Sequence, residues 1–283
     1  MVSTPIGNLG DLPPRAVDAL RASALICCED TRRTGLLLQH AGVRGVPMAI
    51  ANEHTEAARV AEVLHLLGGG ATVTVVTDAG TPGIADPGAR LVRAALDAGF
   101  EVSAVPGPAA LVMALVVSGF DTSRFAFEGF LPRSGVERRE RLSDIARERR
   151  TTVLYEAPHR AARTIDDLAG ACGPERRVAL ARELTKLHEE VWRGTLAEAA
   201  THLDARPPRG EFVVVLDAAP RPDAPDDDAI RVALHAASAG ASSRRDAVAE
   251  VTEDLGVPKK RVYDIALTMA FTARRDRSGA GRG

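Results

Sequence analysis

The sequence has few of the residues that stabilise or equip several large classes of protein. Its three cysteines are few for a chain of 283 residues, and adjacent Cys27 and Cys28 suit neither a zinc site nor a redox pair. The seven histidines show no metal-ligand spacing. The longest apolar run, Ala109–Val117, is shorter than the roughly 20 residues that span a bilayer. We therefore expect no disulfide framework, no metal site and no membrane segment.

Lysine and a strong net charge are also lacking. Lys+Arg total 36 and Asp+Glu total 38, which gives a formal net charge of -2. The overall charge therefore neither favours nor excludes a nucleic-acid partner. Lysine occurs only at positions 186, 259 and 260, so nearly all cationic side chains are arginine. No pattern of basic, apolar and cleavage-site residues opens the sequence, which predicts a cytoplasmic protein that is not exported.

The remaining composition is typical of a globular protein, with 45% hydrophobic and 26% charged residues. The length predicts roughly two domains. Strand-like and helix-like segments alternate along the chain, which is typical of an α/β fold with a mostly parallel sheet and helices on both faces. In the first half we expect strands at Ala24–Cys28, Val46–Ala51, Ala71–Thr77 and Glu101–Val105, and helices at Thr31–His40, Thr55–Leu67 and Ala89–Ala98.

The second half repeats this style without repeating the sequence. We expect helices near Val136–Arg149, Arg160–Ala171 and Leu196–Leu203. Strands are expected at Phe125–Phe130, Thr151–Tyr155, Val178–Arg182, Glu190–Arg193 and Glu211–Leu216. Because the third and fourth of these strands are joined by only a short turn, they cannot be parallel neighbours. The pattern predicts a hairpin, and hence a mixed sheet.

Composition shifts predict the domain boundaries. We expect an N-terminal α/β domain over residues 1–119, with a break near Gly119–Ser123, and a second α/β domain over 120–219. The Pro- and Asp-rich segment that follows predicts a linker at 220–228. Helical patterns then predict a helix-turn-helix-like domain over 229–272, in which Ser243 caps one helix and Gly256 ends it. Residues 273–283 are expected to form a flexible tail.

Three glycine- and proline-rich turns follow predicted strands. They are TPIGNLGD (4–11), TDAGTPGIADPG (77–88) and VPGPAA (105–110). Open α/β sheets bind ligands at the carboxyl ends of their strands, so such turns favour a ligand site. The three-glycine dinucleotide fingerprint and the P-loop are both absent. We expect Gly80 and Gly83 to have positive φ, whereas Asp78 and Asp86 are equally well explained as turn-forming residues.

These turns belong to a longer series of motifs. CEDTRRT, NEH, FEGFLPR, YEAPHR, ARELTKLHEE and RGEFVVVL accompany them in order and at natural spacing. Together the motifs closely resemble the S-adenosylmethionine enzymes of the tetrapyrrole-methylase-like superfamily, and within it the bacterial enzymes that methylate the ribose 2′-oxygen of a cytidine in the decoding region of 16S rRNA. The resemblance covers about residues 3–217, and the C-terminal helices also match. One departure from the family is that only Met1–Thr4 correspond to the first strand, where five or six residues are usual; this departure bears on stability more than on function.

The resemblance implies a fold of two class III α/β domains with the cofactor cleft between them, a small helical C-terminal domain, and a homodimer. It also implies the residues that bind S-adenosylmethionine. Those in the first domain are Pro5, Asp78, Ala79, Gly80, Thr81, Pro82, Ile84, Ala109 and Ala110. Those in the second domain are Tyr155, Ala181 and Glu211.

Catalytic and substrate residues are expected among polar side chains at the strand ends. Glu29, Asp30 and Lys186 are the candidate catalytic residues, because a base helps to deprotonate a ribose hydroxyl. Candidate substrate-binding residues are Arg32, Asn52, Glu53, His54, Arg133, Arg182, Glu183, His188, Lys259 and Lys260. Turn-forming and capping roles explain many of these residues equally well.

RNA binding requires local cationic surface. The arginine-rich stretch Arg133–Arg150 and the basic end of the last helix, Lys259–Arg261, are the candidates. A solvated helix face and a packing domain are their respective alternatives. Two other functions stay open. The first alternative is a methylase of a tetrapyrrole or other small molecule. The second is a nucleic-acid-binding regulator without enzymatic activity.

Overall fold

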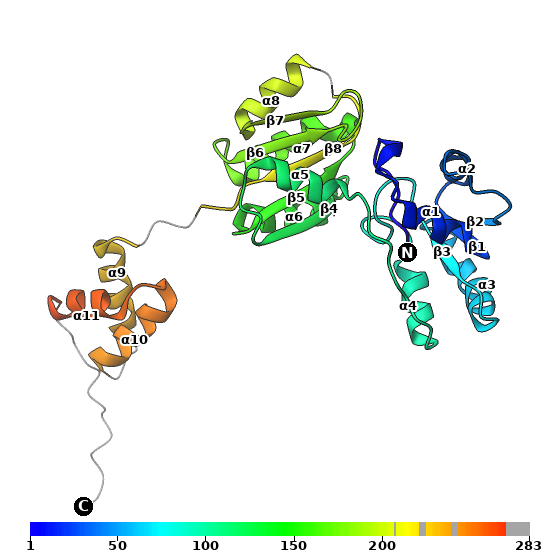
Figure 1. Ribbon diagram of the computed structural model, residues 1–283. Coiled ribbons are helices and arrows are strands. Elements are labelled where there is room, and N and C mark those ends of the chain that lie inside the picture. The colour runs from blue at the N-terminus through cyan, green and yellow to red at the C-terminus, as the bar shows by residue number, and fades with distance from the viewer. Residues whose placement is uncertain (207, 221–224, 239–242, 270–283) are drawn as a thin grey trace, which may run out of the picture. The chain divides into compact units, whose positions relative to one another are not determined.

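The computed structural model describes residues 1–206, 208–220, 225–238 and 243–269. The chain is divided into two compact units, Met1–Ala219 and Pro220–Gly283. The larger unit holds two β-sheets with their helices, and the described part of the smaller unit is helical (Figure 1). No helix in the described residues is both long and apolar enough to cross a membrane. The expected tail at 273–283 and part of the expected linker, 221–224, lie outside the described residues.

The first sheet is short and parallel, with the strand order β2-β1-β3. Its central strand β1 (Leu25–Cys28) is buried along its whole length, which explains its continuous apolar sequence. Strands β2 (Met48–Ile50) and β3 (Val73–Val75) flank it on either side. The helices around this sheet are α1 (Pro14–Arg21), α2 (Thr31–His40), α3 (Glu56–Gly68) and α4 (Ala89–Asp97), and a 3-10 turn, η1, spans Leu9–Asp11.

The N-terminal segment extends this sheet without forming a regular strand. The Val2 N–H donates to the Val75 carbonyl at 3.0 Å, and the Val105 N–H donates to the Met1 carbonyl at 2.9 Å. Val2 and Val105 form only an isolated parallel bridge. The predicted strand at Glu101–Val105 is wrong, because residues 101–104 are exposed and in no strand, and Val105 forms only the isolated bridge.

The second sheet has five strands in the order β4-β5-β8-β6-β7. Strands β4 (Phe125–Phe130) and β5 (Thr151–Glu156) are parallel, and β8 (Phe212–Leu216) is antiparallel to β5. Strands β6 (Arg177–Arg182) and β7 (Glu190–Thr195) form an antiparallel hairpin. The predicted hairpin and mixed sheet are therefore confirmed.

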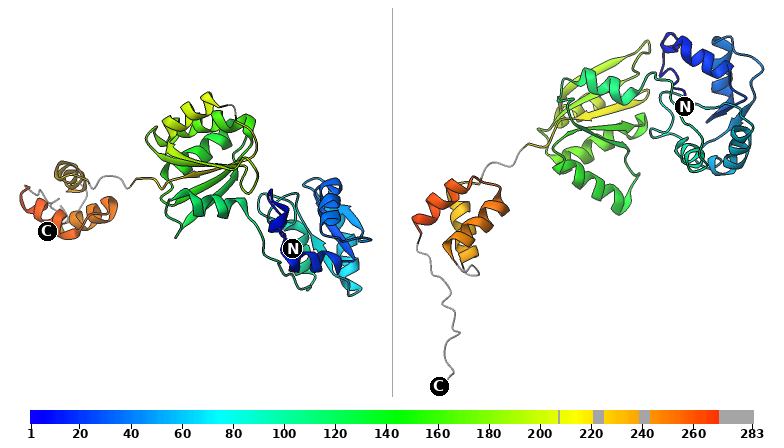
Figure 2. Two further views of the ribbon diagram at one scale, coloured as in Figure 1. Left: turned by 45° about the horizontal axis from the view of Figure 1, so that its top comes forward. Right: turned by 60° about the horizontal axis from the view of Figure 1, so that its bottom comes forward.

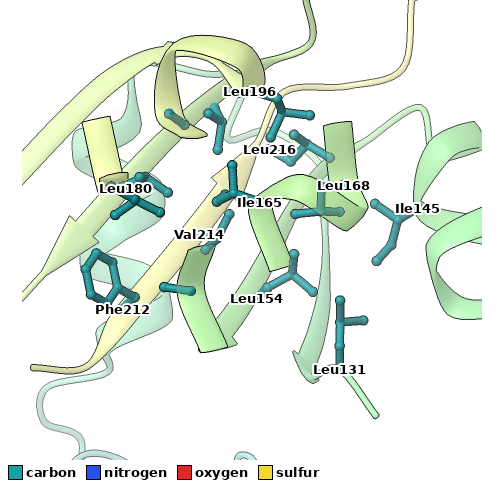
Figure 3. Close-up of a cluster of buried hydrophobic side chains, with 14 of the residues drawn as sticks. Leu131, Ile145, Leu154, Ile165, Leu168, Leu180, Leu196, Phe212, Val214 and Leu216 are labelled. Atoms are coloured by element: carbon teal, nitrogen blue, oxygen red, sulfur yellow. The ribbon is translucent and has the colours of Figure 1, made fainter. Parts of the chain in front are cut away.

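Side-chain alternation gives the second sheet two apolar faces. Leu154, Val214 and Leu216 face one core, which is covered by α6 (Gly135–Arg147), α7 (Pro158–Cys172) and α8 (Leu196–Ala205). Figure 3 shows this core, where Ile165 and Leu168 of α7 pack over the strands. Val153 and Val215 point to the opposite face, because successive strand residues alternate between faces.

Helix α5 (Ala110–Ser118) covers that opposite face. Leu111, Ala114 and Leu115 are buried against the second sheet, although the sequence-based boundary at 119/120 groups this helix with the first domain. That boundary stays a prediction. The other side of α5 is exposed: Val112, Met113, Val116 and Val117 are 39–64% accessible to solvent. The longest apolar run is therefore half core and half surface.

The described part of the smaller unit consists of α9 (Asp227–Ser238), α10 (Arg244–Leu255) and α11 (Lys259–Leu267) (Figure 2). Ile230, Val251 and Val262 are among the residues of its own core. Ser243 caps α10 by accepting from the Asp246 N–H, and Gly256 ends the helix in the left-handed region with φ +61°. Both features were expected from the sequence.

Candidate active site

A cavity of about 430 Å³ in Met1–Ala219 brings together the ends of strands from both sheets. The loop after β3 and Glu29 after β1 contribute from the first sheet. The ends of β4, β5 and β6 and the start of β8 contribute from the second. Its volume falls in the range of small-molecule and cofactor sites. In the described residues, no group of His, Cys, Asp and Glu is placed to hold a metal ion.

The loop Thr77–Gly88 forms one wall, and hydrogen bonds to its backbone hold it in place. Thr4 and Gly80 exchange both backbone hydrogen bonds, at 2.9 and 3.0 Å. Gly80 and Gly83 have φ of +90° and +87°, which confirms the predicted positive φ. Glu56 holds the far end of the loop, because its buried carboxylate accepts from the N–H groups of Gly88 and Leu91 at 3.1 and 3.0 Å.

Carboxylates gather beneath this loop. The Thr77 hydroxyl lies 2.8 Å from Asp86 Oδ2 and 3.3 Å from Glu29 Oε2, within donating distance of both. Burial, with the nearby charges of Glu29 and Asp78, raises the pKa of Asp86 to about 6. Burial and the charge of Glu29 also raise the pKa of Asp78, which lies 3.5 Å from an Arg33 nitrogen. This side of the cavity is therefore acidic.

A strained turn forms part of the opposite wall. Glu183 and Thr185 have φ of +50° and +67°, and Ala85 of the Thr77–Gly88 loop has φ +59°; in the described residues no other non-glycine residue has positive φ. Lys186 Nζ donates to Glu183 Oε1 at 2.8 Å, and the Lys186 charge lowers the pKa of Glu183 against the effect of its burial. Strained backbone of this kind is concentrated at functional sites.

Gly7 allows the N-terminal loop to approach this turn closely. A Cβ at Gly7 would lie 2.3 Å from Lys186 Cγ and 3.0 Å from Thr185 Oγ1. Gly210, with φ +73°, is needed for a similar reason, because a Cβ there would overlap the Glu183 side chain. The two glycines therefore fix where Glu183 and Lys186 lie.

Aromatic residues line the same side of the cavity. The Tyr155 hydroxyl accepts from the Leu111 N–H at the start of α5, at 3.2 Å. The centroid of its ring lies 5.0 Å from that of Phe127, in an edge-on arrangement, and 5.6 Å from that of Phe130, in a tilted one. Tyr155 and Phe130 both line the cavity.

Comparison with known proteins identifies the family. The model of the tetrapyrrole (corrin/porphyrin) methylases matches residues 1–200. The chain belongs to the tetrapyrrole methylase family. A cobalt precorrin-4 methyltransferase shares the fold, with a TM-score of 0.58 at 16% identity over 76% of this chain and 93% of its own. A uroporphyrin-III C-methyltransferase from Thermus thermophilus, solved with S-adenosylhomocysteine, gives 0.53 at 18% identity over 82% and 98%.

Closer relatives in sequence are named ribosomal RNA small subunit methyltransferase I. One from Synechocystis sp. is 43% identical over 95% of this chain and 97% of its own length. One from Pseudomonas aeruginosa is 41% identical over 94% and 95%. A third, from Thermotoga maritima, is 46% identical over 76% of this chain and 96% of its own length.

These comparisons confirm the family and the fold expected from the motifs. They also confirm that this tetrapyrrole methylase is a methyltransferase with S-adenosylmethionine as its donor, and the relatives' names agree with the predicted rRNA methylation. The roles of single residues stay predictions, but the structure gives their positions. Predicted cofactor residues at the cavity are Asp78, Ala79, Gly80, Thr81, Ile84, Ala109, Ala110, Tyr155, Ala181 and Glu211; Glu29, Glu183 and Lys186 also line it. Pro5 and Pro82 are buried beside lining residues.

Other predicted residues lie away from the cavity lining. Asp30 caps α2 and forms an ion pair with Arg32 at 2.7 Å; hydrogen bonds from Arg32 lower the pKa of Asp30 to about 2. Asn52 accepts from the N–H groups of His54 and Thr55, as a turn residue does. Arg182 pairs with Glu190 at 2.7 Å. The remaining ones, Glu53, Arg133, His188, Lys259 and Lys260, are exposed.

The cavity also contains residues that the sequence-based list leaves out. They include Arg33, Thr77, Asp86, Phe130, Glu156 and His159. Most of these positions belong to the motifs 77–88, FEGFLPR and YEAPHR, so these motifs cover segments that line the cavity. The choice of Arg32 over Arg33 depends on helix geometry, because only Arg33 lies on the side of α2 that faces Asp78.

Proposed function

We propose that this chain transfers the methyl group of S-adenosylmethionine to the ribose 2′-oxygen of a cytidine in the decoding region of bacterial 16S rRNA. The observation that carries the proposal is its similarity over 93–95% of its length to relatives named ribosomal RNA small subunit methyltransferase I. The solved tetrapyrrole methylases cited above share the fold at 16–18% identity, which supports no particular substrate.

The cavity suits the donor in charge and in shape. The donor carries a cationic sulfonium and an ammonium group, and the carboxylates of Glu29, Asp78 and Asp86 line the cavity. The Asp78–Pro82 backbone offers polar groups for the methionine portion, and Tyr155 and Ala181 offer apolar surface for the adenosine. When bound, S-adenosylmethionine supplies a methyl group that its positive sulfur has already activated.

The protein must then bring the ribose oxygen into line with that methyl group, at about 3–3.5 Å, and accept its proton. Glu29 and Asp86 are within hydrogen-bonding distance of the same Thr77 hydroxyl. This hydroxyl therefore positions whichever of the two carboxylates accepts the proton. The raised pKa of Asp86, about 6, makes its carboxylate a stronger base than an ordinary aspartate near neutral pH. Lys186, paired with Glu183, provides positive charge on the opposite wall.

The RNA is expected to contact both units. In the described residues, Lys259 and Lys260 form no ion pair, whereas the neighbouring Arg261 pairs with Asp227 at 2.7 Å. Exposed, unpaired cations suit phosphate contacts. Asn52, Glu53, His54, Arg182 and His188 remain candidate substrate residues. We expect the C-terminal unit to strengthen binding to the small subunit and to leave donor binding unchanged.

The same proposal includes a cytoplasmic homodimer. The exposed side of α5, formed by Val112, Met113, Val116 and Val117, is the apolar surface that we assign to the dimer contact. Apolar side chains grouped on one surface are typical of protein interfaces. Light scattering should give the mass of a dimer for the wild-type protein. It should give a smaller mass for Val116→Asp if the assignment is correct.

Methyl transfer to purified small ribosomal subunits tests the function directly. The protein, labelled S-adenosylmethionine and small subunits from cells that lack this activity should yield one modified ribose, which mass spectrometry locates. Large subunits are the matched control and should stay unlabelled. Donor binding without labelling of the small subunit would favour a small-molecule methylase. The absence of donor binding in calorimetry would favour a non-enzymatic regulator.

A further inference from the structure

The end of strand β4 presents an aromatic side chain beside the cavity. Phe130 is 51% exposed, the highest value for any described aromatic residue of Met1–Ala219, and it also lines the cavity. Burial of this ring would be favourable, because it would remove apolar surface from contact with water. Neither the fold nor the proposed donor contacts account for its exposure. Its neighbour Phe127 is instead partly buried in the core.

The backbone after Phe130 is held by two arginines that lie behind it. Arg160 Nη2 donates to the Leu131 carbonyl at 2.6 Å, and Arg138 Nη1 donates to the Pro132 carbonyl at 2.8 Å. Leu131 itself is buried in the core. The segment Phe130–Arg133 is therefore fixed at its two central residues, and its two outer side chains remain available for binding.

A buried ionic network supports both arginines. Arg138 pairs with Asp167 at 2.7 Å while its side chain is only 4% exposed. Arg160 pairs with Glu156 at 3.2 Å, and Glu156 also accepts from the Thr164 hydroxyl at 2.6 Å. Buried charges are costly unless they are fully paired. Such a network fixes a loop in one conformation.

Arg133 ends the same segment and, like Arg139 and Arg149 among the described arginines of the stretch Arg133–Arg150, forms no ion pair. Arg138, Arg141, Arg147 and Arg150 all form ion pairs. Arg133 is exposed, and within the described residues it forms neither an ion pair nor a side-chain hydrogen bond. The segment thus combines an exposed ring at the cavity with an unpaired cation three residues further on.

We propose that Phe130–Arg133 docks the target nucleotide, with the Phe130 ring stacked on its base and the Arg133 guanidinium on a neighbouring phosphate. The inference rests on the proposed RNA substrate and names the residues that hold it. Unstacked bases in RNA are bound by aromatic side chains, and phosphate contacts position a nucleic acid without reading its sequence.

Substitutions that separate stacking from apolar contact test the role of Phe130. Phe130→Leu should lower kcat/KM for small subunits about tenfold or more, because stacking on the base is lost. Phe130→Trp should retain most of the wild-type value. Donor affinity, measured by calorimetry without RNA, should change less than twofold in both variants. Phe125→Leu is the matched control, because Phe125 is 39% exposed on the same strand but does not line the cavity.

Arg133→Ala tests the phosphate contact separately. It should raise KM for small subunits with little change in kcat, and it should flatten the salt dependence of binding by about one counterion. Arg90→Ala is the control, since Arg90 is also exposed but lies on α4, outside the arginine-rich stretch.

Three results would overturn the inference. A Phe130→Leu variant within twofold of the wild-type protein would remove stacking on the base. A parallel loss of donor affinity would make Phe130 part of the adenosine site. Unchanged salt dependence in Arg133→Ala would remove the phosphate contact. Failure of the wild-type protein to label small subunits is a different result, because it refutes the proposed function itself.

Discussion

The two sheets of the α/β unit contribute to the cavity in different ways. The first sheet contributes a loop whose Gly80, Gly83 and Ala85 all have positive φ, together with the carboxylates of Glu29, Asp78 and Asp86. The second sheet contributes side chains, among them Tyr155, Phe130 and Lys186, supported by a buried ionic network. An added Cβ should therefore disable the first wall, whereas removal of side-chain atoms should disable the second.

The largest expected effect is on the loop of the first wall. Gly80→Val should abolish binding of S-adenosylmethionine and leave the fold intact, because a branched residue at φ +90° would distort the loop. Calorimetry measures the binding, and circular dichroism checks the fold. Gly70→Val is the matched control: Gly70 has φ +79° with no atom within 4 Å of an added Cβ, and it lies outside the cavity. Undiminished donor binding by Gly80→Val would remove this loop from the site.

Loss of charged side chains at the cavity should lower the reaction rate without lowering donor affinity. Glu29→Ala and Lys186→Ala should each lower the single-turnover rate about 100-fold, with donor affinity changed less than twofold. Rapid-quench measurements with small subunits give the rate. Glu101→Ala, an exposed carboxylate outside this cavity, should react at the wild-type rate. Rates within twofold of wild type would return Glu29 and Lys186 to structural roles.

The pH dependence of the rate tests the role of Asp86, which lies in the Thr77–Gly88 loop of the first wall. A base with a pKa of about 6 loses activity as the pH falls through that value, so the rate should drop about tenfold per pH unit below 6. Asp86→Asn should lower the rate and remove this dependence. A variant that keeps the wild-type pH profile would assign the proton transfer to another group.

Folding stability should fall over the pH range in which the reaction rate rises. Folded Asp86 keeps its proton up to about pH 6, whereas the unfolded group has a pKa of 3.8. The folded state therefore binds more protons between these values, and this group lowers stability as the pH rises from about 4 to 6. At pH 7, Asp86→Asn should therefore unfold at a higher temperature than wild type. Its free energy of unfolding should be larger by an amount on the order of 1 kcal/mol, once partial solvent exposure is allowed for.

The smallest effect is expected in the C-terminal unit, which contributes to neither wall. Lys259→Glu with Lys260→Glu should weaken binding to small subunits severalfold and flatten its salt dependence, while donor binding stays unchanged. Removal of the chain after Ala219 should weaken binding to small subunits further and should also leave donor binding unchanged. Reversal of two exposed arginines of α4, Arg90 and Arg93, controls for net charge. Unchanged affinity at several salt concentrations would leave this unit with a packing role.

Several features of the fold follow from local rules and were predictable from the sequence. The alternation of apolar strands and amphipathic helices indicates the α/β class. The short turn between β6 and β7 permits only a hairpin, and positive φ at Gly80 and Gly83 follows from their place in a tight loop. The motif series identified the segments of the cavity, because each motif follows or begins a strand of one of the two sheets.

Tertiary packing decided the remainder. The sequence proposed Asp30 and Arg32 as functional, yet these two side chains pair with each other, while Arg33 reaches Asp78 across the loop. Glu101–Val105 has the composition of a strand but forms only the isolated bridge at Val105. The raised pKa of Asp86 and the exposure of Phe130 also depend on residues distant in the chain. The sequence determined the family, the donor and the segments of the site, because these follow from local motifs. Only the folded structure decided which side chains meet, because that depends on how separate strand ends and turns pack together.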